Sequence, residues 1–225
     1  MKKYRAILLY LLLLSVFCSY AQESKKVIKI ACIGNSITQG VGVKDRYNHS
    51  YPGVLRTLLG EGYEVGNFGV SGRTMLSKGD RPYIKEQKYQ DALAFLPDIV
   101  TIKLGTNDTK PRNWVYNEEF KEDLKKMIES FRNLPSNPKI FLCLPVPVAA
   151  NGKWGIRDSV VFNGVIPYIR EVAIEENLLI IDLYTPLKSH PDCFPDTVHP
   201  NEEGARMIAE VIYSFLKEQK IVSSL

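Results

Sequence analysis

Short apolar runs alternate with amphipathic stretches along most of the chain. The apolar runs are rich in β-branched residues and end at Gly, Pro or polar residues, which predicts buried strands at residues 27–33, 63–68, 99–104, 139–144 and 178–183. Apolar residues three or four positions apart predict one helix after each strand, at residues 50–60, 89–96, 118–131, 161–173 and 201–215. Strands that alternate with helices are typical of right-handed crossovers on a mainly parallel sheet.

Five strands joined in this way predict an α/β fold, a flavodoxin-like three-layer sandwich with strand order 2-1-3-4-5. The length of 225 residues suits a single domain, and the sequence shows neither internal repeats nor a low-complexity linker. We therefore expect residues 22–225 to form one domain. Pro167 lies inside the fourth predicted helix, where it predicts a kink or a restart.

The first 21 residues have the pattern of a secretory signal peptide. Three basic residues within the first five precede an apolar run at residues 6–16, and Ser19 and Ala21 supply small side chains at a cleavage site. We expect cleavage after Ala21 and a secreted or periplasmic protein without stable membrane insertion, because the apolar run is too short for a convincing span. Cys18 leaves a lipoprotein open as an alternative, against which the bulky Phe17 argues.

Loss of this leader would remove three basic residues and lower the formal charge from +4 to +1. With so little net charge and no basic run, the sequence gives no reason to expect a nucleic-acid partner. The remaining cysteines, Cys32, Cys143 and Cys193, are odd in number, and we expect no disulfide. No Cys/His cluster has zinc-like spacing, so neither a metal nor another cofactor is predicted.

Residues able to perform acyl transfer follow several of the predicted strands. Ser36 follows the first strand, Gly72 the second, Asn107 the third, and Asp196 and His199 the fifth. Ligands of such sheets bind beyond the carboxyl ends of the strands, so we expect these residues to converge. Together they offer a hydroxyl nucleophile, a base, an acid that orients the base, and donors for an oxyanion.

Each of these residues also has a simpler interpretation. A Ser after a strand is more often a turn residue or a helix N-cap, and an isolated D-x-x-H is more often a surface turn. Asp182 competes with Asp196 as the orienting acid, although it could also cap a helix. Gly72 could serve only a positive-φ turn, and Asn107 only an Asx-turn. The sequence lacks the G-x-S-x-G elbow, the dinucleotide fingerprint and the phosphate loop.

Four blocks together resemble the SGNH hydrolases, also called GDSL esterases: I-G-N-S-I-T at 33–38, N-F-G-V-S-G at 67–72, L-G-T-N-D at 104–108 and D-T-V-H-P at 196–200. The resemblance implies Ser36, Asp196 and His199 as the catalytic triad, and Gly72 and Asn107, with the Ser36 amide, as the oxyanion hole. In one departure, Asn35 stands where the family has Asp before the serine.

Within this family, a signal peptide with these blocks resembles secreted carbohydrate acetylesterases. We therefore expect a serine esterase that removes short acyl groups, most simply acetyl, from a small-molecule or polysaccharide ester. The alternatives are a lipid-type acylhydrolase or lysophospholipase, and a non-catalytic flavodoxin-like binding domain. A binding domain would have no need of all five site residues.

The loops at the predicted site edge are polar and lack the apolar stretch of a lipid-binding lid. They span residues 44–50, 73–83, 109–116 and 149–158, and they contain Arg73, Arg81, Trp114 and Trp154. Aromatic faces and Arg donors suit sugar rings, and we expect Arg73 and Trp114 to contact substrate. For Trp154, loop packing is an equally good explanation.

Overall fold

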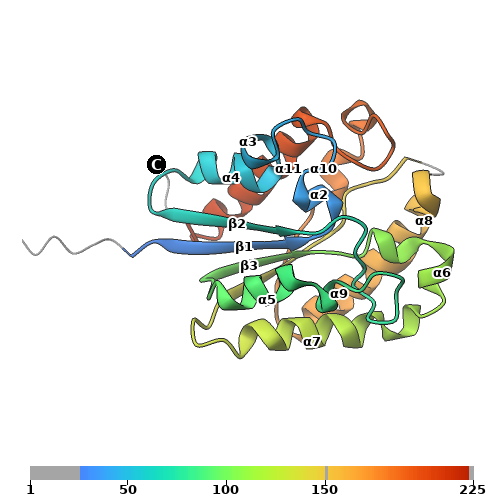
Figure 1. Ribbon diagram of the computed structural model, residues 1–225, viewed down its shortest axis with the longest axis horizontal. Coiled ribbons are helices and arrows are strands. Elements are labelled where there is room, and N and C mark those ends of the chain that lie inside the picture. Colours follow the sequence, from blue (N-terminus) through green and yellow to red (C-terminus); the bar gives the residue numbers. More distant parts are fainter. Residues whose placement is uncertain (1–25, 150–151, 223–225) are drawn as a thin grey trace, which may run out of the picture.

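A computed structural model describes residues 26–149 and 152–222 of the chain, and the predicted signal peptide therefore lies outside the described residues. The five strands are β1 (Ile28–Gly34), β2 (Tyr63–Gly69), β3 (Ile99–Lys103), β4 (Lys139–Cys143) and β5 (Leu179–Ile181). They form one sheet in the order β2-β1-β3-β4-β5, and every pairing is parallel (Figure 1). The predicted fold class and strand order are confirmed.

Helices cover both faces of this sheet. The longer ones are α4 (Tyr51–Leu59), α5 (Gln87–Ala94), α7 (Phe120–Arg132), α9 (Ile166–Glu175) and α11 (Glu202–Glu218). The shorter ones are α2 (Ser36–Gln39), α3 (Arg46–His49), α6 (Pro111–Trp114), α8 (Asp158–Val160) and α10 (Tyr184–Leu187). Among the residues described, no helix is both long and apolar enough to span a membrane.

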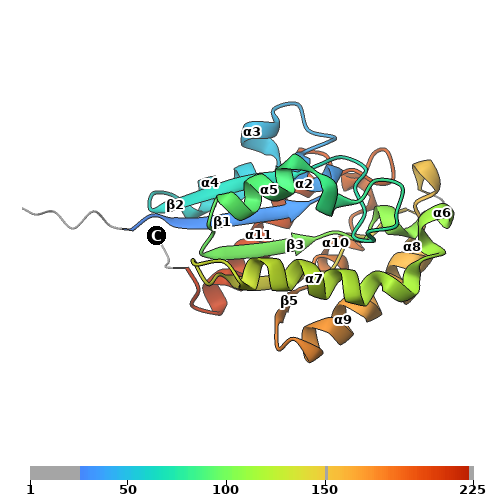
Figure 2. The ribbon, with the colours of Figure 1, turned by 60° about the horizontal axis from the view of Figure 1, so that its bottom comes forward.

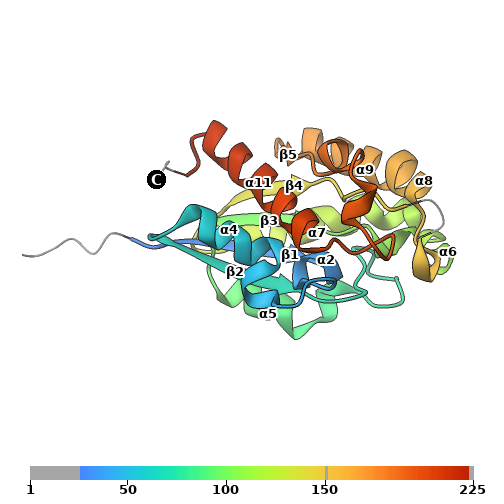
Figure 3. The ribbon, with the colours of Figure 1, turned by 90° about the horizontal axis from the view of Figure 1, so that it is seen from above.

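The two faces of the sheet have separate hydrophobic cores because side chains alternate along each strand. On β1, Ala31 and Ile33 face a core shared with α5, α7 and α9, whereas Ile30 and Cys32 face a core shared with α4 and α11. Figure 2 shows the first set of helices in front of the sheet, and Figure 3 shows α4 and α11 across the opposite face. The helix predicted at residues 201–215 is α11, and its buried side consists of Ala205, Ile208, Ala209, Ile212 and Leu216, with Phe215 only partly buried.

One strand differs from its predicted form, and one helix has the predicted interruption. The strand predicted at 178–183 is shorter because the Asp182 carboxylate accepts hydrogen bonds from the backbone of Tyr184 and Thr185 and starts α10. Asp182 thus has the capping role that was its simpler interpretation. The helix containing Pro167 is interrupted next to that residue, as predicted. A π-helical turn, Val161–Val165, comes directly before α9, which begins at Ile166 with Pro167 in its first turn.

All the strands end at one edge of the sheet, where α2, α6 and α8 also lie (Figure 1). The strand β1 lies between β2 and β3 and pairs with both, and Gly34, its last residue, lies opposite Gly69 and Lys103. This pairing brings the segments that follow β1, β2 and β3 together. The candidate site lies at this edge.

Candidate active site

Ser36 begins the short helix α2 directly after β1. Asn35 caps this helix, because its Oδ1 accepts a hydrogen bond of 3.1 Å from the backbone N–H of Ile37. A Cβ at Gly34 would lie 2.0 Å from Thr38 Oγ1, so only glycine lets α2 fold back this closely onto the strand end. The asparagine that departs from the family pattern therefore fixes the turn that carries Ser36, although its own Nδ2 is buried without a partner in the described part of the chain.

A continuous hydrogen-bond chain joins Ser36, His199 and Asp196. Ser36 Oγ lies 2.8 Å from His199 Nε2, and His199 Nδ1 lies 2.7 Å from Asp196 Oδ2. A carboxylate only accepts hydrogen bonds, so Nδ1 carries the ring proton and Nε2 is left free to accept one from the serine. Both Ser36 and His199 are buried, at 5% and 7% exposure. This geometry is suited to activating a hydroxyl as a nucleophile.

The D-x-x-H segment itself holds the carboxylate in place. Asp196 Oδ1 accepts hydrogen bonds from the backbone N–H groups of Val198 and His199, at 3.0 and 2.7 Å, while Oδ2 faces the imidazole. Burial alone would raise the pKa of Asp196, but these hydrogen bonds outweigh it, and the pKa lies below its ordinary value. The carboxylate therefore stays ionised beside the histidine, as an orienting acid requires.

Gly72 and Asn107, the predicted oxyanion donors, line one cavity together with Ser36 and His199. Gly72 has φ +80°, a conformation that other residues adopt only with strain, so the turn at this position favours glycine. Asn107 is buried, and its Nδ2 donates one hydrogen bond of 3.0 Å to the Arg73 carbonyl oxygen. An amide group has two N–H donors, so the second remains available on the same nitrogen.

Long-range hydrogen bonds fix the two loops that carry these donors. Asp108 is fully buried, and its carboxylate accepts hydrogen bonds from the backbone of Met75 and Leu76, at 3.0 and 2.8 Å. Burial is the largest influence on this carboxyl group and raises its pKa to about 6, despite the two N–H donors. Asn113 adds a bond of 2.9 Å from its amide to the Asn107 carbonyl oxygen. The loop at residues 73–83, which has no periodicity in the sequence, is held in this way.

A hollow of about 170 Å³ opens where these groups meet, and we call it the strand-edge cavity. It is lined by Ser36, Ser71, Gly72, Arg81, Asn107, Lys110, Trp154, Ile156 and His199. The Trp154 ring stands edge-on to the His199 ring, with 5.3 Å between centroids, and 59% of this tryptophan is exposed. The cavity therefore joins the hydroxyl, the base and two candidate oxyanion donors to an exposed aromatic face.

The two residues predicted to contact substrate have other partners. Arg73 donates from Nε to Glu86 and from Nη1 to the Ser71 carbonyl oxygen, at 2.8 and 2.7 Å. Trp114 stacks on Tyr168, with ring centroids 6.0 Å apart, and packs against the core around Phe120. Neither lines the strand-edge cavity. From the same loops, Arg81 and Trp154 do, and so does Lys110, which no sequence pattern had distinguished.

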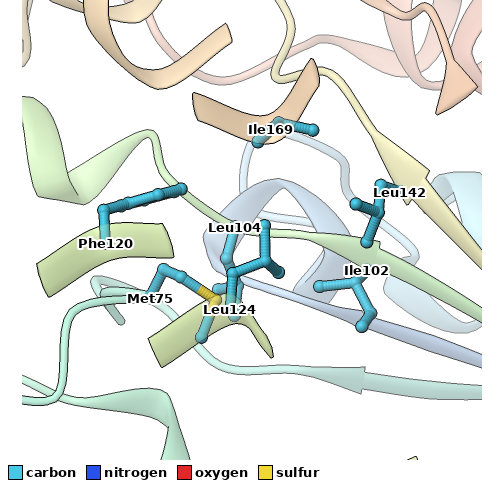
Figure 4. A pocket seen from close by; sticks show the side chains of 7 residues that line it. All are labelled: Met75, Ile102, Leu104, Phe120, Leu124, Leu142 and Ile169. Atoms are coloured by element: carbon cyan, nitrogen blue, oxygen red, sulfur yellow. The ribbon is translucent and has the colours of Figure 1, made fainter. Parts of the chain in front are cut away.

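A second hollow, wholly apolar, lies inside the core between the sheet and the helices α7 and α9 (Figure 4). It measures only about 10 Å³, and the labelled side chains point into it from β3 and the residue after it, from β4, α7 and α9, and from the segment that contains Met75. A void of this size holds about one water molecule and no acyl chain. Among the described residues, no group of three or more His, Cys, Asp or Glu side chains could hold a metal, and all three cysteines are free and buried.

Residues 32–207 match the GDSL-like Lipase/Acylhydrolase family, and the chain belongs to this family. It is 47% identical over 217 residues to an acetylxylan esterase of Xylanibacter ruminicola, an alignment that covers 88% of the chain but 45% of that protein. The chain thus spans about half the length of this curated relative.

Solved structures share the fold. An acetyl xylan esterase, AlAXEase, superimposes with a TM-score of 0.68 at 24% identity, over 84% of this chain and all of that one. A carbohydrate acetylesterase, Est24 from Sinorhizobium meliloti, gives 0.67 at 20% identity, over 85% of this chain and 99% of that one.

Proposed function

We propose that the protein is a serine esterase that removes acetyl groups from a carbohydrate through an acyl-enzyme. The observation that carries the proposal is the Ser36–His199–Asp196 hydrogen-bond chain, which opens into the strand-edge cavity beside Gly72 and Asn107. Membership of the family and the identity to an acetylxylan esterase support the same reaction class.

In the first half of the reaction, His199 Nε2 takes the Ser36 hydroxyl proton while Oγ attacks the acetyl carbonyl carbon. The carbonyl π-electrons move to oxygen and form a tetrahedral oxyanion. When this intermediate collapses, the bond to the sugar oxygen breaks, and the imidazolium gives its proton to that oxygen. The acetyl group remains on Ser36, and Asp196 stabilises the imidazolium without taking its proton.

The second half repeats these steps with water as the nucleophile. His199 takes a proton from the water, whose oxygen attacks the acetyl carbon and displaces Ser36 Oγ, and Oγ recovers the proton from the imidazolium. In both halves we assign the oxyanion to the backbone N–H groups of Ser36 and Gly72 and to the free N–H of Asn107 Nδ2. Such donors act mainly on charge that develops in the transition state.

The size and lining of the cavity favour acetyl over longer acyl groups. Its volume of about 170 Å³ is below that of ordinary ligand pockets, which measure about 300–1,000 Å³. A longer acyl chain gains about 0.8 kcal/mol per CH₂ only if each CH₂ is buried, and polar groups make up about half of the lining of this small cavity. We assign the exposed face of Trp154 to the sugar, because it is the aromatic ring beside His199.

We also propose that the protein is exported and that its partner is an extracellular carbohydrate ester. The N-terminal pattern of basic, apolar and small residues supports this, and the charge of +1 expected after cleavage gives no basis for binding nucleic acid. Sequencing the N-terminus of exported protein should find Gln22 first. Retention of residues 1–21 in that protein would contradict the assignment.

The test of function compares acyl chain lengths and candidate nucleophiles. With p-nitrophenyl esters, kcat/KM should fall from acetyl to butyryl and fall further to octanoyl, and acetylated xylo-oligosaccharides should release acetate. Ser36→Ala should abolish turnover and labelling by a fluorophosphonate. Ser71→Ala is the matched control, because Ser71 lines the same cavity. This variant should still be labelled, at Ser36. Labelling that survives Ser36→Ala, or a preference for octanoyl esters, would overturn the proposal.

A further inference from the structure

Two basic side chains line the strand-edge cavity without an ion-pair partner. Arg81 and Lys110 both contribute to its wall, and neither lies within 4.0 Å of a carboxylate oxygen of the described chain. Other basic residues of the same two loops are paired: Arg73 with Glu86, Lys78 with Glu119 and Arg112 with Asp80. The unpaired cations are thus the ones that face the cavity.

Lys110 is the more enclosed of the two. It is 8% exposed, and burial is the main cause of its pKa lying below the ordinary lysine value. Asp80 and Asp108 are the carboxylates whose charges act on it. The first is bonded to Arg112 and Asn113, and the second to two backbone N–H groups. Lys110 lines the cavity with little of its surface in open solvent and has no carboxylate partner there, so an anionic ligand in the cavity would gain an ion pair that water screens only in part.

Arg81 stands over the candidate oxyanion hole. Its Nη1 lies 3.6 Å from the position that a Cβ would take on Gly72, and its Cδ lies 3.7 Å from the same point. Its backbone is fixed, because the carbonyl oxygen accepts a hydrogen bond of 3.0 Å from Thr74 N, beside the bridge between Thr74 and Pro82. A guanidinium held there can bind a carboxylate through two parallel hydrogen bonds.

The acetyl ester itself does not need these charges. Acetyl is neutral, and the oxyanion that forms from it already has three candidate donors. We therefore propose that the cavity selects acetylated saccharides that carry a carboxylate on the acetylated sugar or on its neighbour, and that Lys110 and Arg81 bind this carboxylate. This inference rests on the proposed function and names the substrate class of the same site. The carboxylate could belong to a uronic acid or to an acetylated sialic acid.

The experiment compares matched substrates with and without the carboxylate. The substrates are acetylated xylo-oligosaccharides with and without a glucuronic acid branch, O-acetylated sialic acid and p-nitrophenyl acetate. For the wild-type protein, kcat/KM should be about tenfold or more higher for at least one carboxylate-bearing sugar than for the neutral oligosaccharide, and the preferred one identifies the source. For Lys110→Met and Arg81→Gln, the loss on that substrate should exceed the loss on p-nitrophenyl acetate by about tenfold, mainly through KM.

Lys78→Gln is the control, because it removes a positive charge from the same loop at an exposed ion pair outside the cavity. It should leave every rate within about twofold. Equal losses on charged and neutral substrates in the Lys110 and Arg81 variants would overturn the inference, because they would show that both cations stabilise the transition state of every ester and do not recognise a carboxylate. So would a wild-type protein without preference for the carboxylate.

A binding measurement separates this inference from the proposed function. Calorimetry on the Ser36→Ala protein should find tighter binding of deacetylated, glucuronate-branched xylobiose than of plain xylobiose, and Lys110→Met should remove the difference. If p-nitrophenyl acetate is hydrolysed but neither kinetics nor binding favours the carboxylate, only the carboxylate selection fails. If no ester is hydrolysed, the proposed function fails, and equal binding of the two sugars would then overturn the selection too.

Discussion

The two sides of the strand-edge cavity are held by different kinds of contact. On the triad side, Asp196 and His199 belong to one turn of four residues, and short hydrogen bonds within that turn fix both. On the loop side, Gly72 and Asn107 come from segments more than 30 residues apart, joined by the bond from Asn107 to Arg73 and the bonds to Asp108. The first arrangement is local in sequence, and the second depends on the completed fold.

This difference has a consequence for the chemistry. The triad side can be aligned as soon as α2 and the 196–199 turn meet, because the hydrogen bonds that orient the carboxylate lie inside the turn. The loop side keeps its donors in position only while a buried carboxylate fastens the 73–83 loop. Substitutions on the triad side should therefore remove activity with little effect on stability, whereas those on the loop side should change both.

Asp196→Asn should have the largest effect, a fall in kcat of about 10³-fold to 10⁴-fold. The asparagine Oδ1 can still accept the two backbone hydrogen bonds, but Nδ2 would present a donor to His199 Nδ1. The ring would then carry its proton on Nε2 and could not accept one from Ser36. Steady-state kinetics with p-nitrophenyl acetate and a thermal melt check this. Asp192→Asn, an exposed acid nearby, is the control, and equal losses in the two variants would contradict the assignment.

Asn107→Ala should lower kcat by about 10²-fold to 10³-fold, with a smaller change in KM, because the lost donor acts on transition-state charge. The same substitution also leaves the Arg73 carbonyl oxygen without its partner, so the melting temperature should fall too. Asn113→Ala is the matched variant, since it loosens the same loops without removing a donor from the cavity. A loss of kcat as large in Asn113→Ala would make loop position, not the Asn107 amide, the cause.

Asp108→Asn should have a more modest effect on catalysis, about tenfold in kcat, and a clear effect on stability. One of the two backbone N–H groups would then face an amide N–H and lose its acceptor. The pKa of Asp108 in the folded state, about 6, lies above the ordinary value of 3.8. Between these two values the folded state binds more protons at this group than the unfolded state does. Its ionisation therefore lowers the free energy of unfolding as pH rises from about 4 to 6. Denaturant titrations across this range should show that slope in the wild type and lose it in the variant.

The fold could be predicted from the sequence because each buried strand and amphipathic helix carries its own periodicity. The parallel sheet follows from the alternation of strands with helices, the strand order was expected because five strands suit the flavodoxin-like arrangement, and the structure confirms both. The end of the fifth strand was predicted too late, because apolar Leu183 follows Asp182, whose side chain binds the backbone at the start of α10.

The cavity lining was predictable only in part. The D-x-x-H turn and the hydroxyl after β1 are visible as short motifs, and the structure brings them within hydrogen-bond distance. A sequence shows that a loop holds two arginines, but not that Glu86 engages Arg73 while Arg81 has no ion-pair partner in the described chain. Trp114 and Trp154 differ in the same way, one packed on the core and the other exposed beside His199. Ion pairing and packing depend on partners distant in sequence.

The smallest effect on activity, with a sizeable effect on stability, is expected at Lys103 beneath the site. This side chain is fully buried on the α4 and α11 face of β3, its Nζ has no hydrogen-bond partner among residues 26–149 and 152–222, and it does not line the cavity. Burial lowers its pKa from 10.5 to about 8, although the nearby Cys143 opposes the shift. Between pH 8 and 10.5 the unfolded chain binds more protons at Lys103 than the folded chain does, so the free energy of unfolding rises with pH there. At pH 7 the buried charge lowers the free energy of unfolding by about 3 kcal/mol.

Lys103→Met should therefore raise the free energy of unfolding at pH 7 by about 1–3 kcal/mol, because an apolar side chain of similar length replaces an unpaired buried charge. Urea titrations at pH 7 and pH 9.5 should show a rise with pH in the wild type and a smaller one in the variant. Lys139→Met, an exposed lysine on the neighbouring strand, should change neither value. The rate on p-nitrophenyl acetate should stay within about twofold, and a variant that lost stability at pH 7 would show that Lys103 has a partner that favours its charged form.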